Sequence, residues 1–182
     1  ERNTTLKELN LWSNNIGAEG AAKRERDYER WPWLRGVHDD TLRTLDLCFR
    51  SIRDAGAQKL ATALERNTTL RKLWLRDNNI GAAGAEKLAT GLERNTTLTE
   101  LYITNNNIGA AGAAKVFATA LERNTTLKEL NLWSNNIGAE GAAKLATALE
   151  RNTTLTYLNL MDNNIGDDGA AKLATALERN TT

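Results

Sequence analysis

The chain has few of the residues on which catalysis and covalent cross-linking depend. Its 182 residues contain one cysteine, Cys48, and one histidine, His38. A single cysteine cannot form an internal disulfide, and these two residues cannot make a metal cluster of histidine and cysteine ligands. One histidine is enough for a catalytic triad, but His38 is better interpreted as a surface histidine beside Asp39 and Asp40. The sequence also has no GxxxxGK[ST] phosphate loop. We therefore expect no enzyme, no cofactor and no metal site.

The chain also lacks an excess of charge and a long apolar run. It contains 24 Lys+Arg and 23 Asp+Glu, which leaves a net charge of +1. This balance argues against a large phosphate-binding surface, and so against nucleic acid as a partner. No apolar run approaches the length of about 18 residues that a membrane-spanning helix requires, so we expect no membrane partner. The chain begins and ends inside a repeated string and is expected to be a fragment, so the missing signal peptide carries little weight.

What the sequence has instead is repetition. Residues 1–23 and 122–144 are the same string, ERNTTLKELNLWSNNIGAEGAAK. The pentapeptide ERNTT recurs with spacings of 28, 29, 28 and 28 residues from Glu65 onward. A fixed period of this length predicts a solenoid whose units are stable only against their neighbours. We expect one domain over 1–182 of about six units: 1–36 (irregular), 37–64, 65–92, 93–121, 122–149, 150–177 and a partial unit at 178–182.

The first half of each unit predicts a short strand. In the unit 122–149 the pattern LxxLxL begins at Leu127, and its second and third leucines lie on one face of a strand. Asn135 and Ile137 complete the pattern LxxLxLxxNxI, which fits most of the units. Stacked in register, such asparagines are expected to form a column that binds main-chain groups of the turn. Arg50 interrupts this column in the second unit.

The second half of each unit predicts an amphipathic helix. In the same unit, Ala142, Leu145, Ala146 and Leu149 recur at helical spacing and form one apolar face. We expect the asparagine that follows the helix, Asn152, to adopt the left-handed conformation.

The tripeptide NTT after each helix is also an acceptor sequence for N-glycosylation. It is one feature repeated with the unit, and we favour a polar turn over a glycosylation site. The asparagines concerned are Asn3, Asn67, Asn95, Asn124, Asn152 and Asn180.

The 28–29-residue unit resembles the leucine-rich repeat of the ribonuclease-inhibitor-like class over residues 1–23 and 37–182. That class includes ribonuclease inhibitor, the sensor regions of NOD-like receptors and the Ran GTPase-activating protein. The IGxxGAxxLAxAL half looks most like the repeats of NOD-like receptors. The resemblance implies a right-handed α/β solenoid, with parallel strands on the concave face and helices on the convex face. It also implies the sensor or scaffold part of a larger, cytoplasmic protein.

The units differ most at strand positions that point away from the core. Aromatic side chains gather there together with an arginine, a combination typical of binding hot spots. We predict a concave surface that binds a protein or peptide, with its centre around Trp74, Arg76, Tyr102 and Trp133. Its residues are Trp12, Trp74, Arg76, Tyr102, Trp133, Tyr157 and Met161. The alternative is cross-strand aromatic packing that stiffens the sheet. Cys48 also occupies one of these outward strand positions. It is interpreted as a tolerated small residue, not a nucleophile.

Two stretches depart from the repeat. The unit 93–121 has 29 residues because Val116-Phe117 replaces a single leucine, so a π-bulge or a shifted loop must absorb the extra residue. The segment 24–41 places charges at inward positions and contains Pro32. It is interpreted as a surface insertion or a scar of recombination or frame shift, ahead of an evolved binding loop. We expect it to be the least regular part of the solenoid.

These observations predict a scaffold that recognises a protein or peptide on its concave face. Two alternatives stay open. One is a GTPase-activating regulator, because the Ran regulator shares this repeat. The other is a consensus-like scaffold without an evolved partner, because the units are nearly identical. Terminal repeats that leave apolar faces open can also associate end to end.

Overall fold

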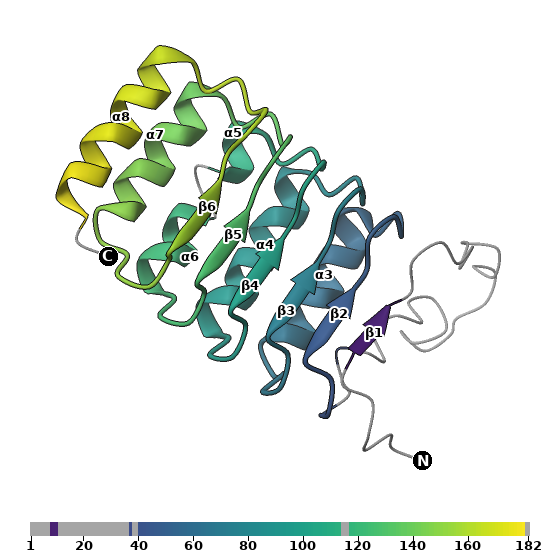
Figure 1. Cartoon of the computed structure of the whole chain (residues 1–182). Coiled ribbons are helices and arrows are strands. Elements are labelled where there is room, and N and C mark those ends of the chain that lie inside the picture. Colours follow the sequence, from purple (N-terminus) through teal and green to yellow (C-terminus); the bar gives the residue numbers. More distant parts are fainter. Residues whose placement is uncertain (1–7, 11–36, 38–39, 114–116, 181–182) are drawn as a thin grey trace.

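The computed structural model describes residues 8–10, 37, 40–113 and 117–180 (Figure 1). Within them, short strands form one parallel sheet whose spatial order follows the chain. Neighbouring strands pair without slippage, since Leu45 lies opposite Leu73 and Leu73 opposite Leu101. The strands are β1 (Glu8–Asn10), β2 (Thr44–Asp46), β3 (Lys72–Trp74), β4 (Glu100–Tyr102), β5 (Glu129–Asn131) and β6 (Tyr157–Asn159).

The helices all lie on one side of this sheet (Figure 1). A parallel pair needs a long crossover between its strands, and from β2 to β6 the described helices provide it. The helices are α3 (Arg53–Leu64), α4 (Ala82–Arg94), α5 (Gly109–Gly112), α6 (Ala118–Arg123), α7 (Gly138–Leu149) and α8 (Gly166–Arg179). The structure thus confirms an α/β solenoid with its strands on the concave face. No helix among the described residues combines the length and apolarity needed to cross a membrane.

The core lies between the sheet and the helices and is built from the columns that the pattern predicted. Inward strand leucines such as Leu73 and Leu130 are completely buried. The expected helix face is confirmed as well, because Leu145 and Ala146 are buried whereas Lys144 is exposed. The four units from 37–64 to 122–149 therefore each contribute several fully buried aliphatic side chains, and burial of each contributes about 1.5–3 kcal/mol.

The extra residue of the unit 93–121 is absorbed within its helical segment. Ala113 and Phe117 have π-helical backbone, which agrees with the first of the two predicted solutions. Phe117 is completely buried between α5 and α6. The wider turn thus leaves the flanking strands in register, as the pairing of β4 with β5 shows.

The predicted asparagine column at the turn after the strand is present. The Oδ1 of Asn163 accepts hydrogen bonds from the main-chain N–H groups of Asn135 (2.9 Å) and Ile137 (3.2 Å) in the preceding repeat. In the second unit, where Arg50 replaces the asparagine, the neighbouring repeat still holds the turn. The Oδ1 of Asn78 accepts from the N–H groups of Arg50 (2.9 Å) and Ile52 (3.3 Å).

The prediction of a left-handed asparagine after each helix is wrong. Asn152 has no positive φ, and Asn95 and Asn124 are extended, with φ of −77° and −75°. The left-handed residues lie in the turn after the strand, for example Asn79 and Asn136. The extended backbone after the helix frees the asparagine side chain to bind main-chain groups on both sides.

These asparagines form a second column, at the turn between helix and strand. The Oδ1 of Asn124 accepts from the N–H groups of Thr126 (2.9 Å) and Leu127 (2.7 Å) in its own turn. Its Nδ2 donates to the carbonyls of Leu92 (2.7 Å) and Asn95 (3.2 Å), which lie in the two preceding units. Each such amide is satisfied and joins two repeats.

The same geometry decides between the two interpretations of NTT. The described asparagines of this column inside the stack are at most 8% exposed: Asn67, Asn95, Asn124 and Asn152. Their amide nitrogens are engaged as donors, so the folded chain does not present them for glycosylation. The polar-turn interpretation is supported.

Most of the segment 24–41 lies outside the described residues, and the prediction made for it stays a prediction. Val37 is buried, and its carbonyl accepts from Asn67 Nδ2 at 2.6 Å.

Candidate protein-binding surface

The structure places the described members of the predicted surface on one face of the sheet. Trp74 and Tyr102 lie on β3 and β4 directly opposite each other, and Tyr157 on β6 lies opposite Glu129 on β5. Trp133 and Met161 follow β5 and β6, and Arg76 follows β3. Trp12 lies outside the described residues.

Trp74 and Tyr102 pack against each other. Their rings stack with centroids 6.2 Å apart and planes 8° from parallel, and both side chains are partly buried. The Tyr102 hydroxyl donates to Glu129 Oε2 at 2.7 Å. This hydrogen bond, together with partial burial and the carboxylate charge, raises the pKa of Tyr102 to about 12. For this pair the structure shows the cross-strand aromatic packing that was the alternative to a binding role.

Cys48 lies near this pair, and an acidic side chain forms a hydrogen bond with it as well. Its N–H donates to the Oδ1 of the buried Asp46 at 2.9 Å. Burial raises the pKa of the Cys48 thiol to about 12, assisted by the hydrogen bond and charge of Asp46. The thiol is therefore protonated at neutral pH and is a poor nucleophile. We refer to Asp46, Cys48, Trp74 and Tyr102 as the packed cluster.

Arg76 is exposed and contacts a residue that the sequence analysis did not single out. Its guanidinium carbon lies 5.5 Å from the centroid of the Phe49 ring, and its Nε lies 2.9 Å from Asp77 Oδ2. Phe49 is 50% exposed and has a φ of 59°, which is unusual for a bulky side chain. The sequence alone could have singled out Phe49, because the other described units have Asp, Asn or Ser at the equivalent position.

The exposed large side chains of this face gather instead on its C-terminal part. Trp133 is 37% exposed, Tyr157 47% and Met161 59%. We refer to these three residues as the exposed patch. The Ser134 N–H donates to the Met161 carbonyl at 3.0 Å, so the segments that carry Trp133 and Met161 are neighbours.

Asparagines on the strands fix the backbone of this patch. The Oδ1 of Asn131 accepts from the Trp133 N–H at 3.1 Å, and the Oδ1 of Asn159 accepts from the Met161 N–H at 2.9 Å. Asp46 holds Cys48 through the same contact in the packed cluster. The arrangement presents three large apolar side chains to solvent on a rigid sheet, and it is suited to binding.

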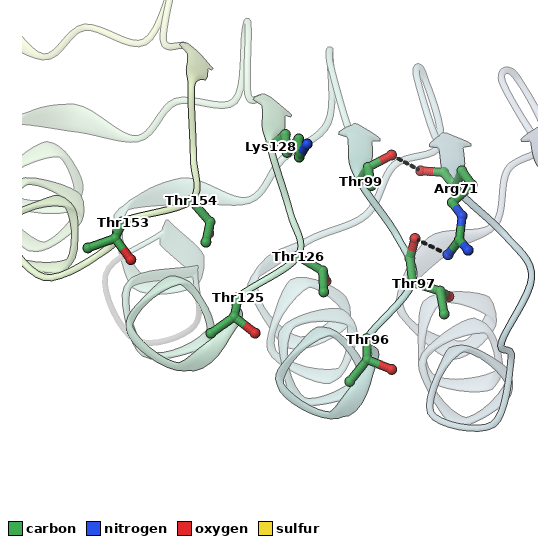
Figure 2. A pocket seen from close by; sticks show the side chains of 9 residues that line it. All are labelled: Arg71, Thr96, Thr97, Thr99, Thr125, Thr126, Lys128, Thr153 and Thr154. Carbon is green, nitrogen blue, oxygen red and sulfur yellow. Dashed lines mark hydrogen bonds between the residues drawn. The ribbon is translucent and has the colours of Figure 1, made fainter. Parts of the chain in front are cut away.

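A groove of about 500 Å³ runs along the N-terminal ends of the strands (Figure 2). The Arg71 Nη1 donates to the Thr97 carbonyl at 2.8 Å, and the Thr99 hydroxyl donates to the Arg71 carbonyl at 3.1 Å. The polar side chains that line this groove thus bind main-chain groups of neighbouring repeats. Its lining residues are Arg71, Thr96, Thr97, Thr99, Thr125, Thr126, Lys128, Thr153 and Thr154. Across the described part of the chain, no three His, Cys, Asp or Glu side chains are grouped so that they could hold a metal ion.

A family model for the leucine-rich repeat matches residues 2–23, 66–89, 94–117, 123–146 and 151–174. The chain belongs to the leucine-rich repeat family. The unit 37–64 of this leucine-rich repeat chain falls between the matched segments, and it contains Phe49, Arg50 and Arg53, where the other units differ.

Solved structures share the fold. Leiomodin-1 actin-binding site 2 superposes with a TM-score of 0.71 at 24% identity, covering 86% of this chain and 90% of that one. The tropomodulin C-terminal domain of Caenorhabditis elegans superposes with a TM-score of 0.63 at 17% identity, covering 82% and 91%. At these identities the likeness shows the leucine-rich repeat fold alone. No curated protein matches the chain by sequence.

Proposed function

We propose that this leucine-rich repeat chain is a non-catalytic scaffold that binds a protein partner on its concave face, with the exposed patch as the anchor. The observation that carries the proposal is the exposure of three large side chains on one face of the sheet, Trp133 and Met161 on neighbouring segments and Tyr157 on β6. Side chains that stay exposed on a strand gain little in stability, whereas large apolar residues at the centre of an interface supply most of its binding energy.

The packed cluster has a supporting role in this proposal. Trp74 and Tyr102 already contact each other, and Tyr102 is bonded to Glu129. Their surfaces are partly removed from water in the free protein, so a partner gains less by covering them. The anchor therefore lies on β6 and just after β5 and β6; it shares Trp133 with the centre expected from the sequence and extends from there toward the C-terminal repeat.

Actin is the first partner to test. The leiomodin-1 domain whose fold superposes on this chain is described as an actin-binding site. That description concerns leiomodin-1, and we extend it to this chain only as a hypothesis. The finer classification as a ribonuclease-inhibitor-like, NOD-like-receptor type of repeat, and a cytoplasmic location, are also proposals; the classification rests on the 28–29-residue period with a helix in the repeats.

The test is a titration of fluorescently labelled monomeric actin with the chain. The binding variant replaces Trp133, Tyr157 and Met161 by alanine, and a matched control replaces three exposed threonines of the convex face, Thr90, Thr147 and Thr175. We expect the binding variant to lose about 100-fold or more in affinity, because hot-spot residues each contribute about 2 kcal/mol. The control is expected to bind like the wild type.

Equal affinity of the binding variant and the wild type would exclude the exposed patch as the anchor. If actin fails to bind the wild-type chain, actin is excluded and the same variants are tested against binders selected from a displayed peptide library. Circular dichroism of each variant separates lost binding from lost folding.

A further inference from the structure

The exposed patch has a fourth corner, which is acidic. Glu129 on β5 lies directly opposite Tyr157 on β6. At the other end of the same two strands, Trp133 and Met161 lie on neighbouring segments. Three large apolar side chains and one carboxylate thus surround the middle positions of β5 and β6. The outward positions of these two repeats, from 129 to 133 and from 157 to 161, contain no basic residue.

The charge of Glu129 is not balanced by the described residues. Glu100 lies opposite Glu129 on the neighbouring strand, and two like charges in this arrangement repel each other. Lys72 pairs with Glu100 at 2.8 Å and offsets its charge. The Tyr102 hydroxyl donates to Glu129 Oε2 at 2.7 Å, and no donor in the described part of the chain binds Oε1. One carboxylate on this face is therefore left without a counter-charge.

The middle positions of the two strands present amide donors. Asn131 and Asn159 lie opposite each other, and the Oδ1 of each accepts a main-chain N–H two residues further on, at 3.1 Å and 2.9 Å. Because an N–H binds the oxygen of an amide, this contact leaves the Nδ2 of each side chain as a donor. Among the described residues no acceptor binds either Nδ2, and both side chains are partly exposed.

The equivalent middle positions of β3 and β4 hold Trp74 and Tyr102, whose rings stack over the sheet. Asparagine is shorter than either aromatic residue, so on β5 and β6 the four outer side chains extend beyond the two in the middle. This surface offers two hydrogen-bond donors at its centre, apolar contact on three corners and a negative charge on the fourth.

An extended segment of polypeptide has the complementary groups. Its main-chain carbonyls accept hydrogen bonds from amide donors. The methylene stem of an arginine or lysine covers an aromatic ring while its charged head reaches a carboxylate, and Tyr157 opposite Glu129 provides such a ring. An acidic or phosphorylated segment would place like charge against Glu129 and is disfavoured.

We propose that the exposed patch together with Glu129 binds an extended segment of a partner protein that carries an arginine or lysine. Glu129 pairs with the cation beside the Tyr157 ring, and the Nδ2 groups of Asn131 and Asn159 donate to main-chain carbonyls of the segment. The other two members of the patch contact its apolar side chains. This inference rests on the proposed function, because it names the chemistry of the partner at the same surface.

The probe for the experiment is a peptide selected from a displayed library of random sequences on the full chain. The enriched sequences are expected to share an arginine or lysine beside aliphatic or aromatic residues. The most enriched peptide is synthesised with a fluorophore, once as selected and once with that residue replaced by its neutral isostere, citrulline or acetyl-lysine. Fluorescence anisotropy gives the affinity of each peptide.

Glu129→Gln removes the charge and keeps an acceptor for Tyr102. It is expected to weaken the selected peptide about 10-fold and to leave the affinity of the neutral peptide unchanged, because the lost interaction needs both charges. The matched control is Glu86→Gln, which makes the same charge change at an exposed position of α4 on the convex face and should bind both peptides like the wild type.

The amide donors are tested with Asn159→Asp. The new side chain keeps an acceptor for the Met161 N–H, as Asp46 does for Cys48, but replaces the donor by a second oxygen. It is measured with the neutral peptide, which has no cation for the new carboxylate to attract. A loss of about 10-fold is expected, because a peptide carbonyl then faces a carboxylate oxygen.

The outcomes separate this inference from the proposed function. Enriched sequences without a shared basic residue, or equal affinity of the wild type and Glu129→Gln for the selected peptide, would overturn the inference. Unchanged binding of the neutral peptide by Asn159→Asp would overturn it as well. The proposed function survives these results as long as the triple alanine variant of the exposed patch no longer binds the peptide. A triple variant that binds like the wild type would refute both, and circular dichroism verifies that each variant is folded.

Discussion

Trp74 and Trp133 lie on the same face of the same sheet, but they have different neighbours. Trp74 has Tyr102 opposite it in the next repeat, and the two rings stack. Trp133 is followed in the next repeat by the flexible Met161, and both side chains are exposed. In this solenoid, a side chain that points outward from the sheet is therefore covered or exposed according to the residue at the equivalent position of the next repeat. The packed cluster stiffens the face, and the exposed patch remains available to a partner.

The largest expected difference between the two regions is in thiol reactivity. Cys48 and Met161 occupy the same column, one in each region. The pKa of Cys48 is raised from 9.0 to about 12, which lowers its thiolate fraction at neutral pH by roughly 100- to 1,000-fold. We expect alkylation of native Cys48 by iodoacetamide to be slower than in the urea-unfolded chain by that factor.

The matched control for this measurement places the thiol in the exposed patch. In a chain carrying Cys48→Ser and Met161→Cys, alkylation should approach the rate of the unfolded chain because the side chain at 161 is exposed. Comparable slow rates at both positions would show that the two regions are equally covered.

The second expected difference between the two regions is the loss of folding stability when their tryptophan is replaced by alanine. Trp74→Ala is expected to lower the free energy of unfolding by about 2 kcal/mol, because it removes a partly buried ring and its stack. Trp133→Ala should lower it by less than about 1 kcal/mol, because the ring is exposed. Urea unfolding of the two variants measures both values, and a larger loss for Trp133→Ala would reverse the assignment of the two regions.

The smallest difference concerns the two tyrosine hydroxyls. Tyr102→Phe removes the hydrogen bond to Glu129 and should cost about 1 kcal/mol, whereas Tyr157→Phe should change stability by less than about 0.5 kcal/mol. The pKa of Tyr102 is raised in the folded state from 10.0 to about 12, so its contribution to stability is complete below pH 10. This contribution is lost as the pH rises through 12.

The tyrosinate absorbance of the folded chain provides the readout. It should show a late step near pH 12 that Tyr102→Phe removes and Tyr157→Phe retains. A late step that survives Tyr102→Phe would contradict the bond to Glu129.

Period and pattern were sufficient to predict the architecture. Leucine spacing located the strands, and the period required each strand to lie beside the next, so the outward columns followed directly. The burial of individual outward side chains could not be predicted, because it depends on how two rings meet across strands. Trp74 and Trp133 are the same residue on the same face, and only the structure distinguishes them.

Two other features depended on hydrogen bonds that a pattern does not reveal. The left-handed conformation expected of Asn152 assumed that the backbone alone ends the helix. In the structure the Asn152 side chain binds carbonyls of the preceding repeats and N–H groups of its own turn, and the backbone of the equivalent Asn95 is extended. The contact of Arg76 with Phe49 was missed because Phe49 lies in a turn column that the comparison of strand positions did not include.

The second asparagine column has a mechanical consequence. Each of its amides binds a carbonyl of the repeat before it, so these bonds join adjacent repeats one after another along the solenoid. A load applied across the two ends passes through every such junction in turn, and an end repeat has a neighbour on one side only. Under tension the molecule should yield from its ends in discrete steps, each releasing 28 or 29 residues. One step corresponds to roughly 95 Å of extended chain, so the solenoid would act as a tether that lengthens by repeats.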